Sequence, residues 1–347
     1  MSRSMVCASI TNDLMGMAVS YLFATPSFVQ AAEEKVGEMV DDIRNSFIER
    51  VHKLDWMDEE TRLVTLRKVN AMKVLIAFPK WMLQAGELDK YYYGLKLDPG
   101  NFLMNAVKIM EVSMKKMLMS VVLPNTVKME TWASDPTDVN AYYSFQDNAI
   151  TIPAAILQFP FYNMGLEVLN YGAIGTILGH ELTHGFDTLG RLYDDAGNFR
   201  PWWTNKTAKE YMRRSSCFIY QYSNYRINDV HANVDGYMTL GENIADNGGI
   251  HEAVEAYKKL AARHGHSLNN VLPGLESLKP DQLFYLSYAN LWCEQSTPMA
   301  KKWAVKGNHA PNPARIWGSL SNSKHFAKTW NCPLYSPMNP QKKCELW

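Results

Sequence analysis

A run of nine residues near the middle of the chain, GHELTHGFD at 179–187, constrains the fold more than any other feature of the sequence. The apolar residues before it recur at helical spacing, and Gly185 suits a helix end, so we expect one helix over 167–185. On that helix His180 and His184 project from the same face, at a spacing that suits a single metal ion. Glu181 is rotated by about 100° from His180. It is therefore expected beside the metal rather than on it.

The H-E-x-x-H pattern can also arise by chance in a chain with nine histidines. Its context favours a metal site, because the apolar side chains of Ile174, Ile177 and Leu178 would bury this helix. Glu181 then suits the role of a base for a water molecule at the metal.

A catalytic zinc ion needs a third protein ligand. One known pattern would place it six residues after the second histidine, but that position is Gly190. A second segment, LGENIADNGG at 240–249, opens a predicted helix with Glu242 and Asp246 on one face. Glu242 can ligate the metal, and Asp246 can accept the free N–H of a zinc-bound histidine.

The alternative for this second helix is a solvated surface helix with two acidic residues. It fits poorly, because the neighbouring residues Ile244 and Ala245 are apolar. Gly248 and Gly249 would let another helix approach closely. We therefore expect His180, His184 and Glu242 to form a three-ligand site with an open position for water.

The rest of the chain has balanced charge and helical periodicity. A formal net charge of zero argues against nucleic acid or an acidic membrane as the main partner. Helices are predicted over 33–54, 58–78 (with Asp58 as the cap), 101–123 and 240–265, and a strand hairpin over 141–157. The methionines of 101–123 are expected in the core. No secretory signal is recognised, and the apolar stretch 149–166 is interrupted by prolines, so no membrane span is predicted.

With GENIADNGG and VNAYYS, the motif GHELTHGFD resembles the neprilysin and endothelin-converting-enzyme family of zinc metallopeptidases. The resemblance runs from about Cys7 to Trp347. It implies a mainly α fold with a small β region: a thermolysin-like zincin catalytic domain over 126–347, after a partial helical lobe over 1–125. It also implies one Zn²⁺ per chain and hydrolysis of oligopeptides on the amino side of bulky hydrophobic residues.

The resemblance assigns roles to individual residues. It implies that Glu181 is the general base, that Asp246 supports His180, and that His309 stabilises the transition state. Arg315 is expected to bind a substrate carbonyl, and Asn140 and Ala141 to bind the substrate backbone by strand addition. The expected pocket for the large apolar side chain is lined by Ile156, Phe161, Ile177 and Trp292.

The five cysteines contain no C-x-x-C pair, which argues against a cysteine-built zinc site. Family members are about twice as long, with a membrane anchor in their N-terminal part. By their pattern Cys217 pairs with Cys344. The remaining three, Cys7, Cys293 and Cys332, would pair with cysteines in the part that this chain lacks. The resemblance also implies an extracellular or cell-surface location.

Three positions depart from the family pattern near the proposed site. Gly307 replaces an aspartate two residues before His309, Ala314 replaces an aromatic residue, and Ser296-Thr297 stand where an arginine is common. The alternative to a peptidase is therefore a truncated or inactive relative that binds zinc or peptide without turnover. A zinc hydrolase acting on non-peptide amides is a third hypothesis, which no residue favours.

Overall fold

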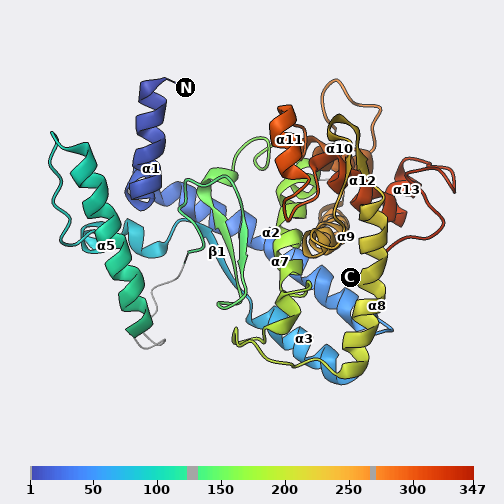
Figure 1. The fold of residues 1–347 in the computed structure, drawn as a ribbon. Helices are drawn as coiled ribbons and strands as arrows, with labels where there is room; N and C mark the ends of the chain where they lie inside the picture. Colours follow the sequence, from blue (N-terminus) through green and yellow to red (C-terminus); the bar gives the residue numbers. More distant parts are fainter. Residues whose placement is uncertain (1, 123–131, 266–270) are drawn as a thin grey trace. The chain divides into compact units, whose positions relative to one another are not determined.

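The structure is a computed structural model that describes residues 2–122, 132–265 and 271–347 (Figure 1). The chain forms two compact units that alternate along the sequence. The first comprises Met1–Lys35, Val74–Asn140 and Thr151–Ile156, and the second comprises Val36–Lys73, Ala141–Ile150 and Leu157–Trp347. The domain boundary predicted at 125 lies outside the described residues and stays a prediction.

The first unit is built mainly from helices α1 (Arg3–Tyr21), α4 (Glu87–Tyr91) and α5 (Phe102–Val122), together with the start of α2 (Pro26–Lys53). The helix predicted over 101–123 is confirmed as α5. Its methionines were wrongly assigned to the core, because Met110, Met114 and Met119 are each more than half exposed within the described structure. Met110 and Met114 are four residues apart and share one side of α5, but helical spacing does not show whether another element covers that side.

Two predicted helices begin the second unit. Most apolar positions of 33–54 are buried in α2, with Val36, Ile43 and Phe47 fully inaccessible. Asp58 caps α3 (Glu59–Ala71) as predicted, since its side chain accepts a hydrogen bond from the Thr61 N–H. The helix predicted over 58–78 is too long, because Lys73–Ala77 form strand β1.

Strand formation after Ala71 has a simple cause: the segment KVLIA carries two β-branched residues and pairs in a sheet. The predicted hairpin is confirmed as β2 (Tyr142–Ser144) and β3 (Ala149–Pro153). The strand order is β1-β3-β2, so β2 lies at an edge of this sheet.

The helix predicted over 167–185 is confirmed with one irregularity. It runs as α6 (Glu167–Asn170), a π-helical turn η4 (Tyr171–Gly175) and α7 (Thr176–His184). Gly185 ends it with φ of −57°, so glycine is not required there for a left-handed turn. A Cβ at Gly185 would instead lie 3.0 Å from Cε of Met72 and 3.2 Å from the Tyr143 hydroxyl.

The remaining helices and strands follow α7 in the chain and belong to the second unit. They are α8 (Asn205–Ser223), β4 (Arg226–Ile227), β5 (Ala232–Asn233), α9 (Leu240–His264), α10 (Pro280–Leu291), α11 (Pro298–Ala304), α12 (Asn312–Asn322) and α13 (Lys324–Thr329). Short 3₁₀ turns lie at Lys80–Leu83, Ala154–Ile156, Gly190–Leu192 and Asn228–Val230. Helix α9 confirms the helix predicted over 240–265.

Helices α7 and α9 cross with their backbones in contact (Figure 1). A Cβ on Gly249 would lie 2.6 Å from the His180 nitrogen, and one on Gly179 would lie 2.8 Å from the Gly249 Cα. Both distances are shorter than any side chain tolerates, so the predicted role of the glycines in close helix approach is confirmed.

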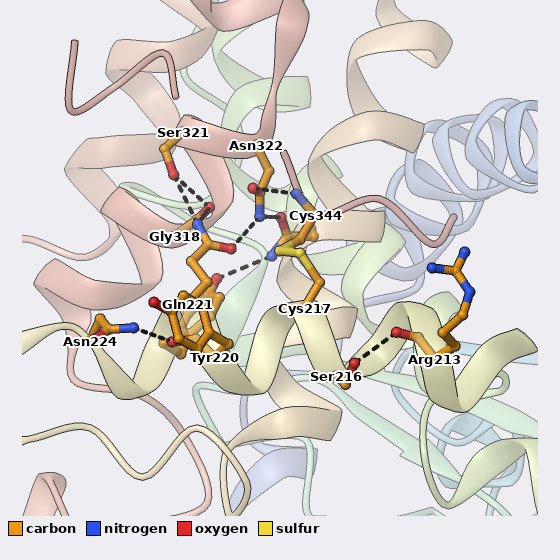
Figure 2. The surroundings of a disulfide bond; sticks show 12 residues. Arg213, Ser216, Cys217, Tyr220, Gln221, Asn224, Gly318, Ser321, Asn322 and Cys344 are labelled. Atoms are coloured by element: carbon orange, nitrogen blue, oxygen red, sulfur yellow. Dashed lines mark hydrogen bonds between the residues drawn. A yellow bond between two sulfur atoms is a disulfide. The ribbon is translucent and has the colours of Figure 1, made fainter. Parts of the chain in front are cut away.

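A disulfide bond between Cys217 and Cys344 ties the C-terminal segment to α8 (Figure 2), as the family pattern implied. Beside it Asn322 of α12 accepts a hydrogen bond from the Cys344 N–H and donates to Gln221. Trp347 then packs against an aromatic cluster of Phe47, Trp56, Phe186, Trp203 and Tyr211. The other three cysteines form no disulfide in this structure.

Among the described residues, no single helix combines the length and apolar composition needed to cross a membrane, although the bent pair α1 and α2 meets those criteria together.

Candidate metal centre

Three side chains bring donor atoms together where α7 crosses the first turn of α9. Nε2 of His180 lies 3.0 Å from Nε2 of His184. Oε2 of Glu242 lies 3.2 Å from Nε2 of His180 and 3.4 Å from Nε2 of His184. Ligand atoms held tetrahedrally at zinc bond lengths lie about 3.3 Å apart. The three spacings therefore fit one zinc ion, with a coordination position left for water or substrate.

The surroundings of Glu242 give a second reason to place a cation here. Its Oε2 is buried and has no partner with hydrogen-bond geometry in the described structure, although three imidazole nitrogens lie within 3.4 Å. A carboxylate facing imidazole lone pairs is the kind of site that a divalent metal satisfies.

The other ring nitrogen of each α7 histidine is held by a buried carboxylate. Nδ1 of His180 lies 2.9 Å from Oδ1 of Asp246, and Nδ1 of His184 lies 2.7 Å from Oδ2 of Asp187. An Nδ1–H donated to a carboxylate leaves the Nε2 lone pair free for a metal. The contact of Asp246 was predicted, but that of Asp187 was missed. Its signal was present in the sequence: a carboxylate three residues after the second histidine, just past the helix end.

Arg315 keeps Asp246 charged despite its burial. The guanidinium donates from Nε to Oδ2 at 2.8 Å and from Nη2 to Oδ1 at 2.5 Å. Burial alone would raise the pKa of Asp246, but Arg315 and His180 lower it to about 2. Arg315 also stacks on Trp292, with Cζ 3.8 Å from the ring centroid. This places Arg315 and Trp292 beside the donor cluster.

Glu181 is buried next to the same groups, with only 6% of its surface exposed. Burial raises the pKa of its carboxyl. A carboxylate with a raised pKa is a better proton acceptor than an exposed glutamate.

His309 reaches the cluster from the segment before α12. Its Nε2 lies 2.9 Å from Oε2 of Glu242, and His180, Glu242 and His309 form a group close enough to share an ion. Its side chain is 56% exposed, against 8% for His180. At Gly307 the nearest atom to an added Cβ would be the Ala304 carbonyl oxygen, at 3.4 Å. The loop therefore has room for a side chain where the family carries aspartate.

The residues predicted to bind substrate fall into two groups. Phe161, Ile177 and Trp292 belong to the second unit and are partly exposed. Ala141, buried, immediately precedes edge strand β2 of that unit. Asn140 and Ile156 belong to the first unit.

Comparison with known proteins identifies the family of the chain. Sequence profiles of peptidase family M13 match residues 140–346 and residues 1–79. The chain is 40% identical over 343 residues to the endothelin-converting enzyme homolog of Locusta migratoria, and 39% identical over 343 residues to endothelin-converting enzyme 1 of Homo sapiens. These alignments cover 98% of this chain but only 46% and 44% of the two relatives. The chain thus spans less than half of their length.

Solved structures show the same relationship. The zinc metalloprotease Zmp1 of Mycobacterium tuberculosis, in complex with an inhibitor, superposes with a TM-score of 0.85 at 29% identity, over 98% of this chain and 50% of that one. PepO from Lactobacillus rhamnosis superposes with a TM-score of 0.81 at 25% identity, over 96% and 49% of the two chains. The predicted fold class, a mainly α zincin domain with a small β region and a partial helical lobe, is confirmed. The chain belongs to peptidase family M13.

Proposed function

We propose that this protein is a zinc-dependent endopeptidase that hydrolyses oligopeptides on the amino side of bulky hydrophobic residues. The observation that carries the proposal is the triangle of donor atoms from His180, His184 and Glu242, with separations of 3.0–3.4 Å. His184 is assigned as a ligand in preference to His309, because its Nδ1 is held by buried Asp187 while His309 is largely exposed.

Zinc bound by these three ligands would lower the pKa of a water molecule and polarise the scissile carbonyl. The side chains around it supply the proton transfers. Glu181 accepts the proton of the attacking water, a role supported by its burial and raised pKa. His309 donates to the oxygen that becomes negative in the transition state. Arg315 is held by Asp246 through Nε and Nη2, and its other N–H groups donate to a substrate carbonyl.

The preference for bulky apolar residues rests on the side chains next to the donor cluster. Ile177 lies three residues before His180 on α7 and therefore near the same face of the helix. Trp292 lies under the Arg315 guanidinium, and the Phe161 carbonyl accepts a hydrogen bond from the Ile174 N–H. Ile156 is assigned to the same pocket by family resemblance. Asn140 and Ala141, next to edge strand β2, are proposed to pair with the substrate backbone.

We also propose an oxidising, extracellular or cell-surface environment with peptides as partners. The Cys217–Cys344 disulfide supports this location, because such bonds persist in oxidising compartments.

The test is peptide cleavage by zinc-loaded protein, comparing wild type with Glu181→Gln. A quenched fluorescent peptide with a central Phe or Leu is the substrate, and metal content is measured on the same samples. We expect one zinc per chain in both proteins and at least a ~100-fold loss of cleavage in the variant, because the proton acceptor is removed while the ligands remain. Glu255→Gln, on the exposed side of α9, is the matched control and keeps full activity.

The competing proposal is a protein that binds zinc or peptide without turnover. Gly307, in place of the family aspartate, favours it. Zinc bound at one ion per chain with no cleavage of any oligopeptide by the wild type would support this alternative and refute the endopeptidase.

A further inference from the structure

Lys68 of α3 is a buried lysine whose three donors are all used. Its side chain has no exposed surface, and its Nζ donates to the carbonyl oxygens of Gly185, Gly190 and Tyr193, each at 2.7 Å. A buried ammonium is costly unless every proton finds an acceptor. The three carbonyls belong to one short stretch, residues 185–193, which leaves the end of α7 directly after His184.

The carbonyl of Gly185 lies at the C-terminal end of α7, where the helix dipole concentrates negative charge. A cation at this end stabilises the last turn of the helix, and that turn carries His184. Lys68 therefore acts on the proposed ligand helix from a different helix, more than a hundred residues earlier in the chain.

The same stretch contains Asp187, and its conformation depends on the residues that Lys68 holds. Oδ1 of Asp187 accepts hydrogen bonds from the N–H groups of Leu189 and Gly190, each at 2.7 Å. Gly190 is thus held through its N–H by Asp187 and through its carbonyl by Lys68. The space is also closed, because a Cβ on Gly190 would lie 1.8 Å from the His184 carbonyl oxygen. With Oδ1 fixed in this way, Oδ2 is directed at Nδ1 of His184.

The charges around Lys68 also support its placement at this stretch. Burial lowers the pKa of Lys68 to about 7, while the negative charges of Asp187, Asp194 and Asp195 oppose that fall. These carboxylates favour the ammonium form of Lys68, the form that has three protons for the three carbonyl oxygens.

We infer that Lys68 is a positioning residue of the metal centre, which fixes residues 185–193 so that Asp187 orients His184 toward the ion. The inference rests on the proposed function only in taking His184 as a zinc ligand. It predicts that loss of Lys68 weakens zinc binding itself and does not merely lower the stability of the fold.

The experiment compares wild type, Lys68→Met and Thr65→Val as metal-free full chains, at a temperature where all are folded by circular dichroism. Zinc affinity is measured by competition with a chromophoric chelator, and thermal unfolding is followed separately. Methionine keeps most of the length of the side chain without its donors. Thr65 is equally buried on the same helix, and its hydroxyl has no hydrogen-bond partner in the described structure, so Thr65→Val is a matched control.

We expect Lys68→Met to raise the zinc dissociation constant about 10–100-fold, the size typical for loss of an outer-shell partner, and Thr65→Val to leave it within twofold. Asp187→Asn should weaken binding similarly, and Lys68→Met should add little to it, because both act through one contact. If Lys68→Met does not fold, Lys68→Gln, which keeps two donors, decides the question by the same measurement.

A folded Lys68 variant with reduced thermal stability and wild-type zinc affinity would overturn the inference and leave Lys68 a purely structural residue. Additive effects of Lys68→Met and Asp187→Asn on zinc affinity would also contradict it. Failure of the wild type to bind zinc would instead refute the proposed function, so the two ideas fail by different results.

Discussion

Helix α9 carries two buried carboxyl groups, six residues apart, one of which is ionised at neutral pH while the other is neutral. Asp246 is 4% exposed and has a pKa of about 2, whereas Glu252 is 1% exposed and has a pKa of about 8. Both reach α7, Asp246 at His180 and Glu252 at Thr183. Equal burial therefore does not decide whether a carboxyl keeps its charge.

The difference lies in the partners. Asp246 receives two hydrogen bonds from the Arg315 guanidinium and faces His180, so ionisation is compensated. Burial raises the pKa of Glu252, and only the Thr183 hydroxyl and more distant charges oppose the rise. Its other oxygen, Oε2, has no partner in the described structure. Negative charge is thus kept where it supports a metal ligand and is suppressed at a purely structural contact.

Proton counting at Thr183 supports the neutral form of Glu252. The Thr183 hydroxyl oxygen lies 2.7 Å from the Gly179 carbonyl oxygen and 3.0 Å from Oε1 of Glu252. One hydroxyl proton satisfies one acceptor, and a carbonyl can only accept. A protonated Glu252 can donate to Thr183 while Thr183 donates to Gly179, and both contacts are then hydrogen bonds.

Removing the compensating cation should produce the largest effect. In Arg315→Met the Asp246 carboxylate loses its guanidinium and becomes a buried charge facing only His180. We expect the free energy of unfolding at pH 7 to fall by about 3–5 kcal/mol, as when one partner of a buried pair is removed. Urea unfolding of the metal-free protein measures it.

Arg213→Met is the control for this variant, since Arg213 is 68% exposed and pairs with Glu210 on the surface. Its loss should change stability little. Equal effects of the two substitutions would show that Arg315 does not determine the charge of Asp246.

The contribution of Glu252 to stability should depend on pH. Glu252 has a pKa of about 8 in the folded chain and 4.5 as a free side chain. Between these values the unfolded chain releases the proton that the folded chain keeps. The stability that this group contributes is therefore complete below pH 4.5 and is lost as the pH rises to about 8.

Glu252→Gln removes this dependence while keeping the shape of the side chain. We expect the variant to gain stability relative to wild type from pH 5 to pH 8, by at most about 1.4 kcal/mol per unit of pH. Urea unfolding of both proteins at pH 5, 7 and 9 gives the difference. Glu255→Gln, an exposed neighbour, should show a constant difference. A constant difference for Glu252→Gln as well would mean that Glu252 is ionised in the folded protein.

The proposed ligands and the supporting residue Asp246 could be predicted because they form two local pairs. His180 and His184, and Glu242 and Asp246, are each four residues apart on a helix, and helical spacing alone puts them on one face. The glycines that let α7 and α9 touch were also recognisable, since Gly248 and Gly249 interrupt an otherwise good helix sequence. That the two faces meet could be inferred only from the chemistry, because zinc needs a third ligand.

The missed features depend on contacts across the sequence. Lys68 lies in a helical pattern like that of any surface lysine, and nothing local shows that its ammonium meets three carbonyls 117 to 125 residues away. Strand β1 was missed because VLI continues the apolar period of the preceding helix, and pairing with β3 decided its conformation. The different charge states of Asp246 and Glu252 were equally hidden, since they follow from Arg315 and Thr183.

The smallest expected effect tests whether the Glu252 contact is separate from the metal centre. Thr183→Val removes the hydroxyl that joins α7 to Glu252, and Thr183→Ser keeps it while losing only the methyl group. We expect Thr183→Val to cost about 1 kcal/mol more than Thr183→Ser in urea unfolding at pH 6, because the valine variant loses two hydrogen bonds of about 1 kcal/mol each and the serine variant loses a buried methyl group worth about 1 kcal/mol. Zinc affinity should stay at the wild-type level in both, because His180 and His184 keep Asp246 and Asp187 as partners. A weaker zinc affinity in Thr183→Val but not in Thr183→Ser would show that neutral Glu252 also supports the metal. Asp246 and Glu252 would then differ in charge but share the same role.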